Sequence, residues 1–494
     1  MTTQTLRRRL KKLSAAKGLE APPNILIAAA ECAPLAKTGG LADVIGTLPA
    51  SLRSLGFDAR VIIPCHRVIK ERYGDKLQLI TEFEVRLGWR RQYVGVMLLK
   101  LGRVPVYLID NEFYFGNKIY EDGDFGGEQY AYFCRAVLET LRRIDFVPQL
   151  IHCNDWHTAA IPMLLRTQYG GTELEGVRTV FTIHNIAYQG QFGCGFLGDV
   201  LEIDPKYHTW EYLVECGCGN LMKSACIFAD KVNTVSPSYA AEILTPEYGE
   251  GLDKVLRACS GKLSGIVNGI DMRAFDPETD PALPEHFSAA EPGGKGACKD
   301  GLCAELGLDG GAPLLSMVTR MTPQKGFDLV IPAMEEILSR GFSFVLLGTG
   351  EKRYEDFMRK AELEHPGRVR AVLSYNEELA HRIYAASDFF LMPSKFEPCG
   401  ISQMLAMRYG ALPIVRETGG LRDTVSSYNQ YTGEGTGFGF ARFDCTDMLS
   451  ALDRALAAYG DNERLAFIRR SAMESDFSFT SSAFEYAKLY LDTL

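Results

Sequence analysis

The segment 391–400, Leu-Met-Pro-Ser-Lys-Phe-Glu-Pro-Cys-Gly, brings together residue types that could do chemistry. A short apolar run ends at Met392, and an apolar pattern with helical spacing begins after Gly400. This pattern predicts a strand, a loop and a helix. Glu397 would then follow a strand end, where open α/β sheets bind ligands, and the N–H groups of the helix suit a phosphate. A surface loop in which Glu397 caps the helix is the alternative.

A second segment, 37–44 (Lys-Thr-Gly-Gly-Leu-Ala-Asp-Val), follows the apolar run 25–30 and leads into a helical pattern. Gly39 and Gly40 allow the backbone to approach a ligand closely, and Lys37 supplies a positive charge on a mobile side chain. The segment therefore predicts a second ligand-binding loop at a strand end. The alternative is a strand-to-helix turn in which Lys37 points into water.

A third segment, 319–326 (Thr-Arg-Met-Thr-Pro-Gln-Lys-Gly), follows the apolar run 313–318. Arg320 and Lys325 flank the predicted strand end and the start of a helix near Gly326. Two cations that converge on a strand end fit the two charges of a diphosphate. Basic residues on an ordinary surface could have the same spacing.

Taken together, the three segments resemble the family of bacterial glycogen synthases and plastid starch synthases. Other segments match this family in the same order along the chain, and the resemblance runs from about Asn24 to the C-terminus. The set is far more specific than any one segment. The further matches are 152–157 (His-Cys-Asn-Asp-Trp-His), 182–185 (Thr-Ile-His-Asn), 245–253, 267–271 and 418–421.

The resemblance implies a retaining glycosyltransferase that transfers glucose from ADP-glucose to the non-reducing end of glycogen or another α-1,4-glucan. Glu397 would bind sugar hydroxyls and place negative charge near the developing cation. Arg320 and Lys325 would neutralise the departing diphosphate. The N–H groups of Ile401 and Ser402, at the start of the following helix, would stabilise the same phosphates.

The resemblance also implies roles for residues that precede the second group of predicted strands. Lys37 would approach the phosphates or the acceptor, and Asn268 would lie near the sugar. His184 would contact the glucose ring, unless it is a core histidine bonded to neighbouring backbone. Asp155 would act on the acceptor side, and capping the helix after His157 is an alternative role that is compatible with this one.

The remaining implied contacts lie in the second half. Tyr375 would stack on the nucleobase, Cys399 would pack beside the sugar without covalent chemistry, and Gly400 would belong to the same binding loop. The sequence departs from the family's usual pattern at Cys153 and Asn154, where Ala and His are more common. Neither change removes a residue to which a role is assigned.

At 494 residues the chain is expected to form two or more domains. Both halves alternate apolar runs with helical periodicity, which is typical of βα units around parallel sheets. We predict an α/β protein with two Rossmann-like, doubly wound parallel-sheet domains facing across a cleft, the GT-B fold of the family. The predicted parts are a basic N-terminal tail (1–23), an acceptor-side domain (24–265), a nucleotide-sugar-binding domain (266–475) and a C-terminal helix that crosses back to the first domain (476–494).

Eleven apolar runs are predicted to be strands. In the first half they are Ile25–Ala30, Arg60–Ile63, Val104–Ile109, Leu150–His152, Thr179–Ile183 and Lys231–Val235. In the second half they are Leu314–Val318, Phe344–Leu347, Val369–Leu373, Phe389–Met392 and Leu412–Val415.

Composition and charge exclude several classes of protein. The net charge of −9 argues against a nucleic-acid partner, and no apolar run is long enough to predict a membrane span. The 13 cysteines are scattered, and the spacing of Cys216 and Cys218 does not fit common zinc sites. We therefore expect reduced thiols and a cytoplasmic location. Because side chains and a helix N-terminus would neutralise the diphosphate in the implied reaction, we expect neither a metal nor another cofactor. The basic N-terminal segment leaves a plastid-targeting remnant as an alternative.

Several other functions are alternatives to a glucan synthase. A Rossmann dehydrogenase fits poorly, because Gly348-Thr349-Gly350 is followed by Arg353 where its fingerprint requires a small residue. A synthase that uses UDP-glucose, a phosphorylase-like enzyme that carries pyridoxal phosphate, and an inactive glucan-binding scaffold remain alternatives. An inactive scaffold would be expected to lose the charges that Lys37, Arg320 and Glu397 retain.

Overall fold

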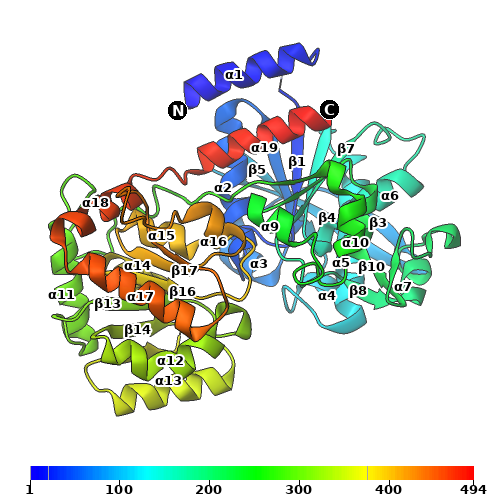
Figure 1. Cartoon of the computed structure of the whole chain (residues 1–494). Coiled ribbons are helices and arrows are strands. Elements are labelled where there is room, and N and C mark those ends of the chain that lie inside the picture. The colour runs from blue at the N-terminus through cyan, green and yellow to red at the C-terminus, as the bar shows by residue number, and fades with distance from the viewer. Residues whose placement is uncertain (1, 20–21, 375) are drawn as a thin grey trace. The chain divides into compact units, whose positions relative to one another are not determined.

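The computed structural model describes residues 2–19, 22–374 and 376–494, and the chain divides into two compact units (Figure 1). Unit 1 comprises Met1–Val235, Ala240–Gly269 and Phe479–Leu494, and unit 2 comprises Ser236–Tyr239 and Ile270–Ser478. Tyr375, which was predicted to stack on a nucleobase, lies outside the described residues. Among the described residues, no helix is long and apolar enough to cross a membrane.

Unit 1 is built on a nine-stranded sheet with the order β12-β11-β7-β6-β1-β2-β5-β4-β3. Neighbouring strands from β12 to β5 are parallel, and β4 pairs antiparallel with both β5 and β3. The strands are β1 (Asn24–Ala28), β2 (Asp58–Pro64), β3 (Gln78–Leu87), β4 (Arg90–Leu101), β5 (Val104–Asp110), β6 (Leu150–Asn154), β7 (Arg178–Ile183), β11 (Lys231–Thr234) and β12 (Leu263–Gly265).

The six strands predicted in the first half are confirmed, with bounds that differ by one or two residues. The β3–β4 hairpin was not predicted. Its strands alternate exposed and buried positions and β3 is largely exposed, so the hairpin lacks the continuous apolar runs of the buried parallel strands. The predicted parallel sheet is therefore present and carries an antiparallel extension at one edge.

Helices and a small second sheet complete unit 1. The helices are α1 (Thr3–Ala16), α2 (Gly40–Leu55), α3 (Arg67–Tyr73), α4 (Glu112–Phe115), α5 (Gly123–Leu141), α6 (Ala160–Gln168), α7 (Cys194–Asp199), α8 (Leu221–Phe228), α10 (Asp253–Ala258) and α19 (Phe479–Thr493), while α9 (Pro237–Glu242) spans a division between the units. The small sheet has the order β8 (Gln191–Gly193), β10 (Cys218–Asn220) and β9 (Val214–Glu215).

The segment predicted as a basic N-terminal tail contains a helix that packs on the rest of unit 1. In α1, Leu6 and Leu10 are 3% and 1% exposed and belong to the core of unit 1 with residues of α2 and α19. The two leucines are four positions apart and share one face of the helix, while the arginines and lysines of α1 face solvent. Figure 1 shows α1 alongside α19.

The last helix of the chain, α19, also belongs to unit 1. Its Tyr486 and Tyr490 are fully buried, and the Tyr490 hydroxyl lies 2.8 Å from Nδ1 of His152 on β6. The opening helix α1 thus packs against the closing helix α19 within unit 1, although most of the sequence separates them.

Unit 2 contains a six-stranded, all-parallel sheet with the order β15-β14-β13-β16-β17-β18. The strands are β13 (Leu314–Val318), β14 (Ser343–Leu347), β15 (Val369–Val372), β16 (Phe389–Met392), β17 (Leu412–Arg416) and β18 (Phe438–Phe440). The first five confirm the predicted strands of the second half. The helices are α11 (Gly294–Leu306), α12 (Phe327–Ser339), α13 (Lys352–Glu364), α14 (Glu377–Ala386), α15 (Ser402–Arg408), α16 (Gly419–Thr424), α17 (Cys445–Tyr459) and α18 (Asn462–Met473).

In each sheet the order of strands reverses beside its first strand. In unit 2 the chain moves outward from β13 to β15 and returns to place β16 on the other side of β13. In unit 1 the same reversal lies between β1 and β6. Ligands of open α/β sheets bind outside the carboxyl ends of the strands at such switch points. We therefore expect ligands to bind near the residues that follow β13 and β16 in unit 2, and near those that follow β1 and β6 in unit 1.

Candidate functional site

In unit 2, the predicted charged residues follow the two strands at the switch point. Arg320 and Lys325 come after β13, and Glu397 comes after β16. The Lys325 Nζ lies 2.6 Å from Glu397 Oε2, and the Ser394 hydroxyl donates to the same carboxylate oxygen at 3.0 Å. Glu397 is 5% exposed. The structure thus joins two separately predicted residues in one nearly buried ion pair.

The alternative role of Glu397 as a helix cap is wrong. Helix α15 begins at Ser402, and its N-cap residue Ile401 makes no side-chain capping bond. The carboxylate of Glu397 is instead held by Lys325 and Ser394. Its position is therefore set by the loop after β13.

The backbones of these two loops are bound to each other. The Lys395 N–H donates to the Gln324 carbonyl at 2.8 Å, and the Gln324 side-chain amide donates to the Phe396 carbonyl at 3.3 Å. Gly326 has φ +80°, and a Cβ there would lie 2.0 Å from the Pro393 carbonyl oxygen. Only glycine allows this approach, which brings Lys325 within reach of Glu397.

Arg320 lies in the loop after β13 and is exposed. Its neighbours are fixed by a turn after β14, because the Met321 N–H donates to the Thr349 carbonyl and the Glu351 N–H donates to the Met321 carbonyl, both at 2.9 Å. The Gly348-Thr349-Gly350 turn therefore supports the segment that carries Arg320. An exposed guanidinium on a fixed backbone is free to meet an anion from solvent.

The remaining predicted residues of unit 2 follow Glu397 directly. Cys399 is buried, Gly400 has φ +73°, and Ile401 and Ser402 lead into α15. A glycine from a distant segment supports this stretch, because the Gly420 N–H donates to the Glu397 carbonyl at 3.0 Å. The structure thus places all the described residues predicted in unit 2 at one edge of the sheet.

Unit 1 has a second group of polar residues, at the carboxyl ends of β6 and β7. Asp155 follows β6 and His184 follows β7, and the two strands are adjacent and parallel. Asp155 Oδ1 accepts the His184 N–H at 2.8 Å and the Asn185 N–H at 3.4 Å. Asp155 precedes the short helical turn Trp156–Thr158 but makes no capping bond to it, so its alternative role as a helix cap is wrong.

The imidazole of His184 is oriented by a side chain that the sequence analysis noted only as a departure from the family pattern. His184 Nε2 lies 2.9 Å from Asn154 Oδ1, while Asn154 Nδ2 donates to the Ala28 carbonyl at 3.1 Å. Because Oδ1 can only accept, Nε2 carries the hydrogen and Nδ1 carries the lone pair. The imidazole of His184 thus bonds to a side chain, unlike the alternative of a core histidine bonded to neighbouring backbone.

A third carboxyl group, Glu31, was missed by the sequence analysis. It follows β1, which neighbours β6, and it is 2% exposed. Glu31 Oε2 accepts the Thr38 N–H at 2.5 Å and the Thr38 hydroxyl at 2.8 Å. Glu31 therefore holds the loop that contains Lys37, Gly39 and Gly40. The only sequence signal was an acidic residue just after an apolar strand.

The Lys37 side chain forms an ion pair with Asp43. Its Nζ lies 2.7 Å from Asp43 Oδ1, in the first turn of α2. Both side chains are more than one-third exposed, so the pair is weak and Lys37 can exchange it for a substrate anion.

Burial shifts the titratable groups of unit 1 toward their neutral forms. Burial raises the pKa of Asp155 to about 7, with N–H bonds from His184 and Asn185 opposing the shift and the charge of Glu31 adding to it. Burial also raises the pKa of Glu31, against the hydrogen bonds from Thr38 and Tyr120. Burial lowers the pKa of His184 to about 3. This part of unit 1 is therefore suited to neutral polar groups such as hydroxyls.

Asn268, predicted near the sugar, belongs to unit 1 and is 5% exposed. Within the part of the chain that the structure describes, its Oδ1 is a buried atom with no hydrogen-bond partner. A buried carbonyl oxygen without a donor is costly, so this atom is a candidate acceptor for a ligand hydroxyl.

No group of three or more His, Cys, Asp or Glu side chains that could hold a metal ion occurs in residues 2–19, 22–374 and 376–494.

Arg416 is a further residue that the sequence analysis missed. Its guanidinium donates to the Lys395 carbonyl at 2.5 Å and the Ala441 carbonyl at 3.2 Å, which fixes the loop before Glu397. A lone arginine at the end of β17 carried no signal for this role.

Two family models match the chain in succession. The starch synthase catalytic domain matches residues 24–258, and glycosyl transferases group 1 matches residues 302–472. The first match therefore lies in unit 1 and the second in unit 2, except for the short return segment at 236–239.

Curated glycogen synthases are similar over almost the whole chain. The glycogen synthase of Geobacillus thermodenitrificans is 48% identical and covers 94% of this chain and 97% of the relative. That of Streptococcus equi subsp. equi is 47% identical and covers 95% of this chain and 100% of the relative.

Solved structures agree at the level of the fold. The catalytic domain of starch synthase IV from Arabidopsis thaliana, bound to ADP and acarbose, superposes with a TM-score of 0.89 at 35% identity, covering 96% of this chain and 99% of that one. A sucrose-phosphate synthase from Thermosynechococcus elongatus shares the fold with a TM-score of 0.62 at 18% identity, over 95% and 98% of the two chains.

Proposed function

Because the chain belongs to the starch and glycogen synthase family of GT-B glycosyltransferases, we propose that it extends α-1,4-glucans with glucose from ADP-glucose. In this reaction the bond between the anomeric carbon and the diphosphate breaks, and its electron pair leaves with the diphosphate. The 4-hydroxyl oxygen at the non-reducing end of the acceptor forms the new bond to that carbon and loses its proton. The α configuration is retained.

The observation that carries this proposal is the cluster of Arg320, Lys325 and Glu397 at the switch point of unit 2. In our proposal, Arg320 and Lys325 neutralise the charge that builds on the departing diphosphate. The first N–H groups of α15, with Ile401 and Ser402, add donors for the same phosphates. A cation that is already paired with a buried carboxylate is held in position before the substrate arrives.

Glu397 has a second role in the proposal. Ser394 and Lys325 share one of its oxygens, Oε2, so Oε1 is available in the plane of the carboxylate for a sugar hydroxyl. The negative charge also favours the positive charge that develops on the sugar ring.

For unit 1 we propose recognition of the sugar and the acceptor by neutral groups. The lone pair on His184 Nδ1 and the Asn268 Oδ1 accept hydrogen bonds from hydroxyls. Asp155, with its pKa near neutrality, holds the backbone of His184 and can accept a proton released nearby. Lys37, on the loop that Glu31 secures, supplies a positive charge for the donor phosphates or the acceptor.

The preference for the adenine nucleotide rests on similarity alone. The starch synthase IV domain with 35% identity was solved with ADP and acarbose. Tyr375 lies outside the described residues, so base recognition is argued from the relatives. A cytoplasmic location stays a prediction, and similarity to bacterial enzymes gives the plastid alternative no support.

The decisive experiment is a donor panel with glycogen as acceptor. We expect kcat/KM with ADP-glucose to exceed that with UDP-glucose by at least tenfold, because hydrogen bonds to the base edge supply about 1–3 kcal/mol of discrimination. An equal or higher value with UDP-glucose would overturn the donor and leave the glucan synthase in place. Transfer from neither donor, with release of glucose 1-phosphate from glycogen and phosphate, would favour a phosphorylase.

A further inference from the structure

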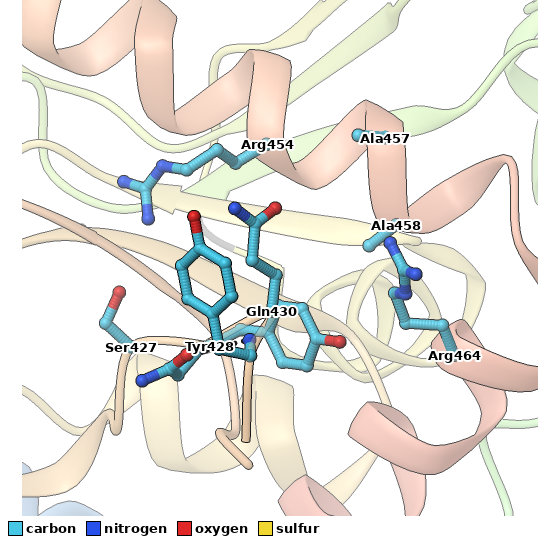
Figure 2. A pocket seen from close by; sticks show the side chains of 9 residues that line it. Ser427, Tyr428, Gln430, Arg454, Ala457, Ala458 and Arg464 are labelled. Atoms are coloured by element: carbon cyan, nitrogen blue, oxygen red, sulfur yellow. Dashed lines mark hydrogen bonds between the residues drawn. The ribbon is translucent and has the colours of Figure 1, made fainter. Parts of the chain in front are cut away.

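Unit 2 contains a cavity of about 420 Å³ that the proposed reaction does not use (Figure 2). It is lined by the segment 427–431, the C-terminal half of α17 and Arg464 of α18. Segment 427–431 leads into the amino end of β18, whereas the residues of the proposed site follow the carboxyl ends of β13 and β16. Since the sheet is all parallel, the cavity lies at its opposite edge.

The loop that forms one wall is fixed by its own hydrogen bonds. The Tyr428 N–H donates to the Gly437 carbonyl at 2.7 Å, and the Asn429 N–H donates to the Glu434 carbonyl at 2.8 Å. Asn429 Oδ1 also accepts the Tyr431 N–H at 2.9 Å. This backbone presents the ring of Tyr431, which is 90% exposed. A large ring held in water on an ordered loop is a candidate contact for a ligand.

The lining suits the faces and edges of sugar rings. The rings of Tyr428 and Tyr431 offer flat apolar surfaces, and Ala457 and Ala458 of α17 contribute methyl groups to the lining. The amide of Gln430 offers a donor and an acceptor on one side chain. A hexose has an apolar face that stacks on aromatic rings and an edge of hydroxyls that such amides bind.

The two charged residues of the lining favour an extended ligand over a single phosphate. Figure 2 shows Arg454 and Arg464 at opposite sides of the cavity, with Tyr428 and Gln430 between them. Arg454 donates to the Gly439 carbonyl at 2.5 Å, and the Arg464 guanidinium lies 3.4 Å from the Asp461 carboxylate. Each guanidinium group therefore has its own anchor. Because the guanidinium groups do not converge, each can donate to hydroxyls at one end of a chain.

We propose that this cavity is a second binding site for an α-1,4-glucan chain, distinct from the site of transfer. The inference rests on the proposed function, since the acceptor is a polymer that presents many chains at once. A chain held here keeps the same polymer molecule attached while another chain end reacts, which raises the effective concentration of ends. The volume falls in the range of about 300–1,000 Å³ that is usual for ligand sites and holds a short stretch of glucan.

The first test measures binding without transfer. β-Cyclodextrin is a cyclic α-1,4-glucan without a non-reducing end, so it can occupy a chain-binding site but cannot be extended. Titration calorimetry should show that Tyr431→Ala loses one of the binding events of the wild-type protein, whereas Tyr431→Trp keeps it because a ring is retained. Leu363→Ala is the matched control, since Leu363 is a second highly exposed apolar side chain of unit 2, on α13.

The second test is kinetic and separates this inference from the proposed function. For Tyr431→Ala and Gln430→Ala, the KM for glycogen should rise about tenfold, because a tether is lost. The kcat, the KM for ADP-glucose and the KM for maltoheptaose should stay at the wild-type values. Absence of transfer by the wild-type protein would refute the proposed function, and the cyclodextrin titration would still test the cavity.

Two outcomes would overturn the inference. One is equal binding of β-cyclodextrin, with an equal KM for glycogen, in the wild-type protein and Tyr431→Ala. The other is binding of inorganic phosphate that is lost in Arg454→Ala or Arg464→Ala while cyclodextrin does not bind, which would assign the cavity to an anion.

Discussion

The two polar clusters of this protein are built alike and charged differently. Each lies at the carboxyl ends of parallel strands beside the point where strand order reverses. In unit 2 the cluster is ionic, with Lys325 Nζ 2.6 Å from Glu397 Oε2, and Arg320 is exposed on the same loop as Lys325. In unit 1, burial moves Asp155, Glu31 and His184 toward their neutral forms.

The same architecture thus provides two electrostatic environments, which suit two kinds of substrate group in the proposed reaction. A departing diphosphate gains negative charge, and fixed cations stabilise it more in the transition state than before. Sugar hydroxyls carry no charge, so buried neutral donors and acceptors bind them without the cost of desolvating an ion. The strand ends supply the geometry in both clusters, and the Lys325 cation paired with the buried Glu397 distinguishes the ionic cluster from the neutral one.

The largest effect is expected from the cations of unit 2. Arg320→Ala should lower kcat about 100–1,000-fold with little change in melting temperature, since Arg320 is exposed and removal of one charge-stabilising donor has this typical effect. Steady-state kinetics and thermal melts measure both quantities. Lys352→Ala, which removes an exposed lysine from α13, is the control and should be neutral.

Lys325 needs a paired design, because Lys325→Ala leaves the buried Glu397 without its cation. Breaking such a pair from one side typically costs about 3–5 kcal/mol of stability. The double variant Lys325→Met/Glu397→Gln removes both charges, and it should fold and remain inactive. Near-normal turnover in Arg320→Ala and in this double variant would remove the ionic cluster from catalysis.

A smaller but selective effect on stability is expected at Gly326. Gly326→Ala combines φ +80° with a Cβ at 2.0 Å from the Pro393 carbonyl, so it should lower stability by more than the ~1–3 kcal/mol of backbone strain alone. Gly341 has φ +97° and open space around it, so Gly341→Ala measures the strain without the clash. Denaturant unfolding compares the two variants, and equal losses would show that the two loops are not held by this approach.

The raised pKa of Asp155 in unit 1 predicts that the stability of the protein depends on pH. The folded protein keeps the Asp155 proton up to a pKa of about 7, whereas the unfolded chain loses it near 3.8. This contribution to stability is present in full below the unfolded value and is lost as pH rises through about 7. Asp155→Asn should therefore gain melting temperature relative to the wild-type protein as pH rises from about 5 to 8.

The control for this experiment is Asp447→Asn. Asp447 is hydrogen-bonded to Arg442, which lowers its pKa to about 2, so it stays ionised throughout that range. The difference between this variant and the wild-type protein should not change with pH. A flat difference for Asp155→Asn as well would mean that Asp155 is ionised in the folded protein, and the contrast between the units would fail.

The smallest expected effect is that of chelation. If side chains and backbone N–H groups neutralise the diphosphate, excess EDTA should leave the rate of transfer unchanged. Loss of activity that returns only with Mg²⁺ or Mn²⁺ would move the charge stabilisation from Arg320 and Lys325 to a metal ion.

Many of the elements could be predicted from local sequence. Apolar runs bounded by polar or glycine-rich segments predicted eleven parallel strands, because buried parallel strands are apolar on both faces. The motifs around Lys325 and Glu397 named a pair that the structure joins, although 72 positions separate the two residues. The β3–β4 hairpin was not predicted because its strands are half exposed. Helix α1 was not predicted because only two buried leucines lie among its basic residues.

Local sequence was enough to identify the residue types at the strand ends, and through them the family. The contacts of those residues became known only from the folded units: Asn154 orients His184, Glu31 holds the Lys37 loop, and Arg416 supports the loop before Glu397. Hydrogen-bond partners and pKa values depend on neighbours brought together from distant segments, so local sequence does not reveal them. Burial is likewise a property of the folded unit. It favours the neutral forms of Asp155, Glu31 and His184, whereas the buried Glu397 is paired with the cation of Lys325.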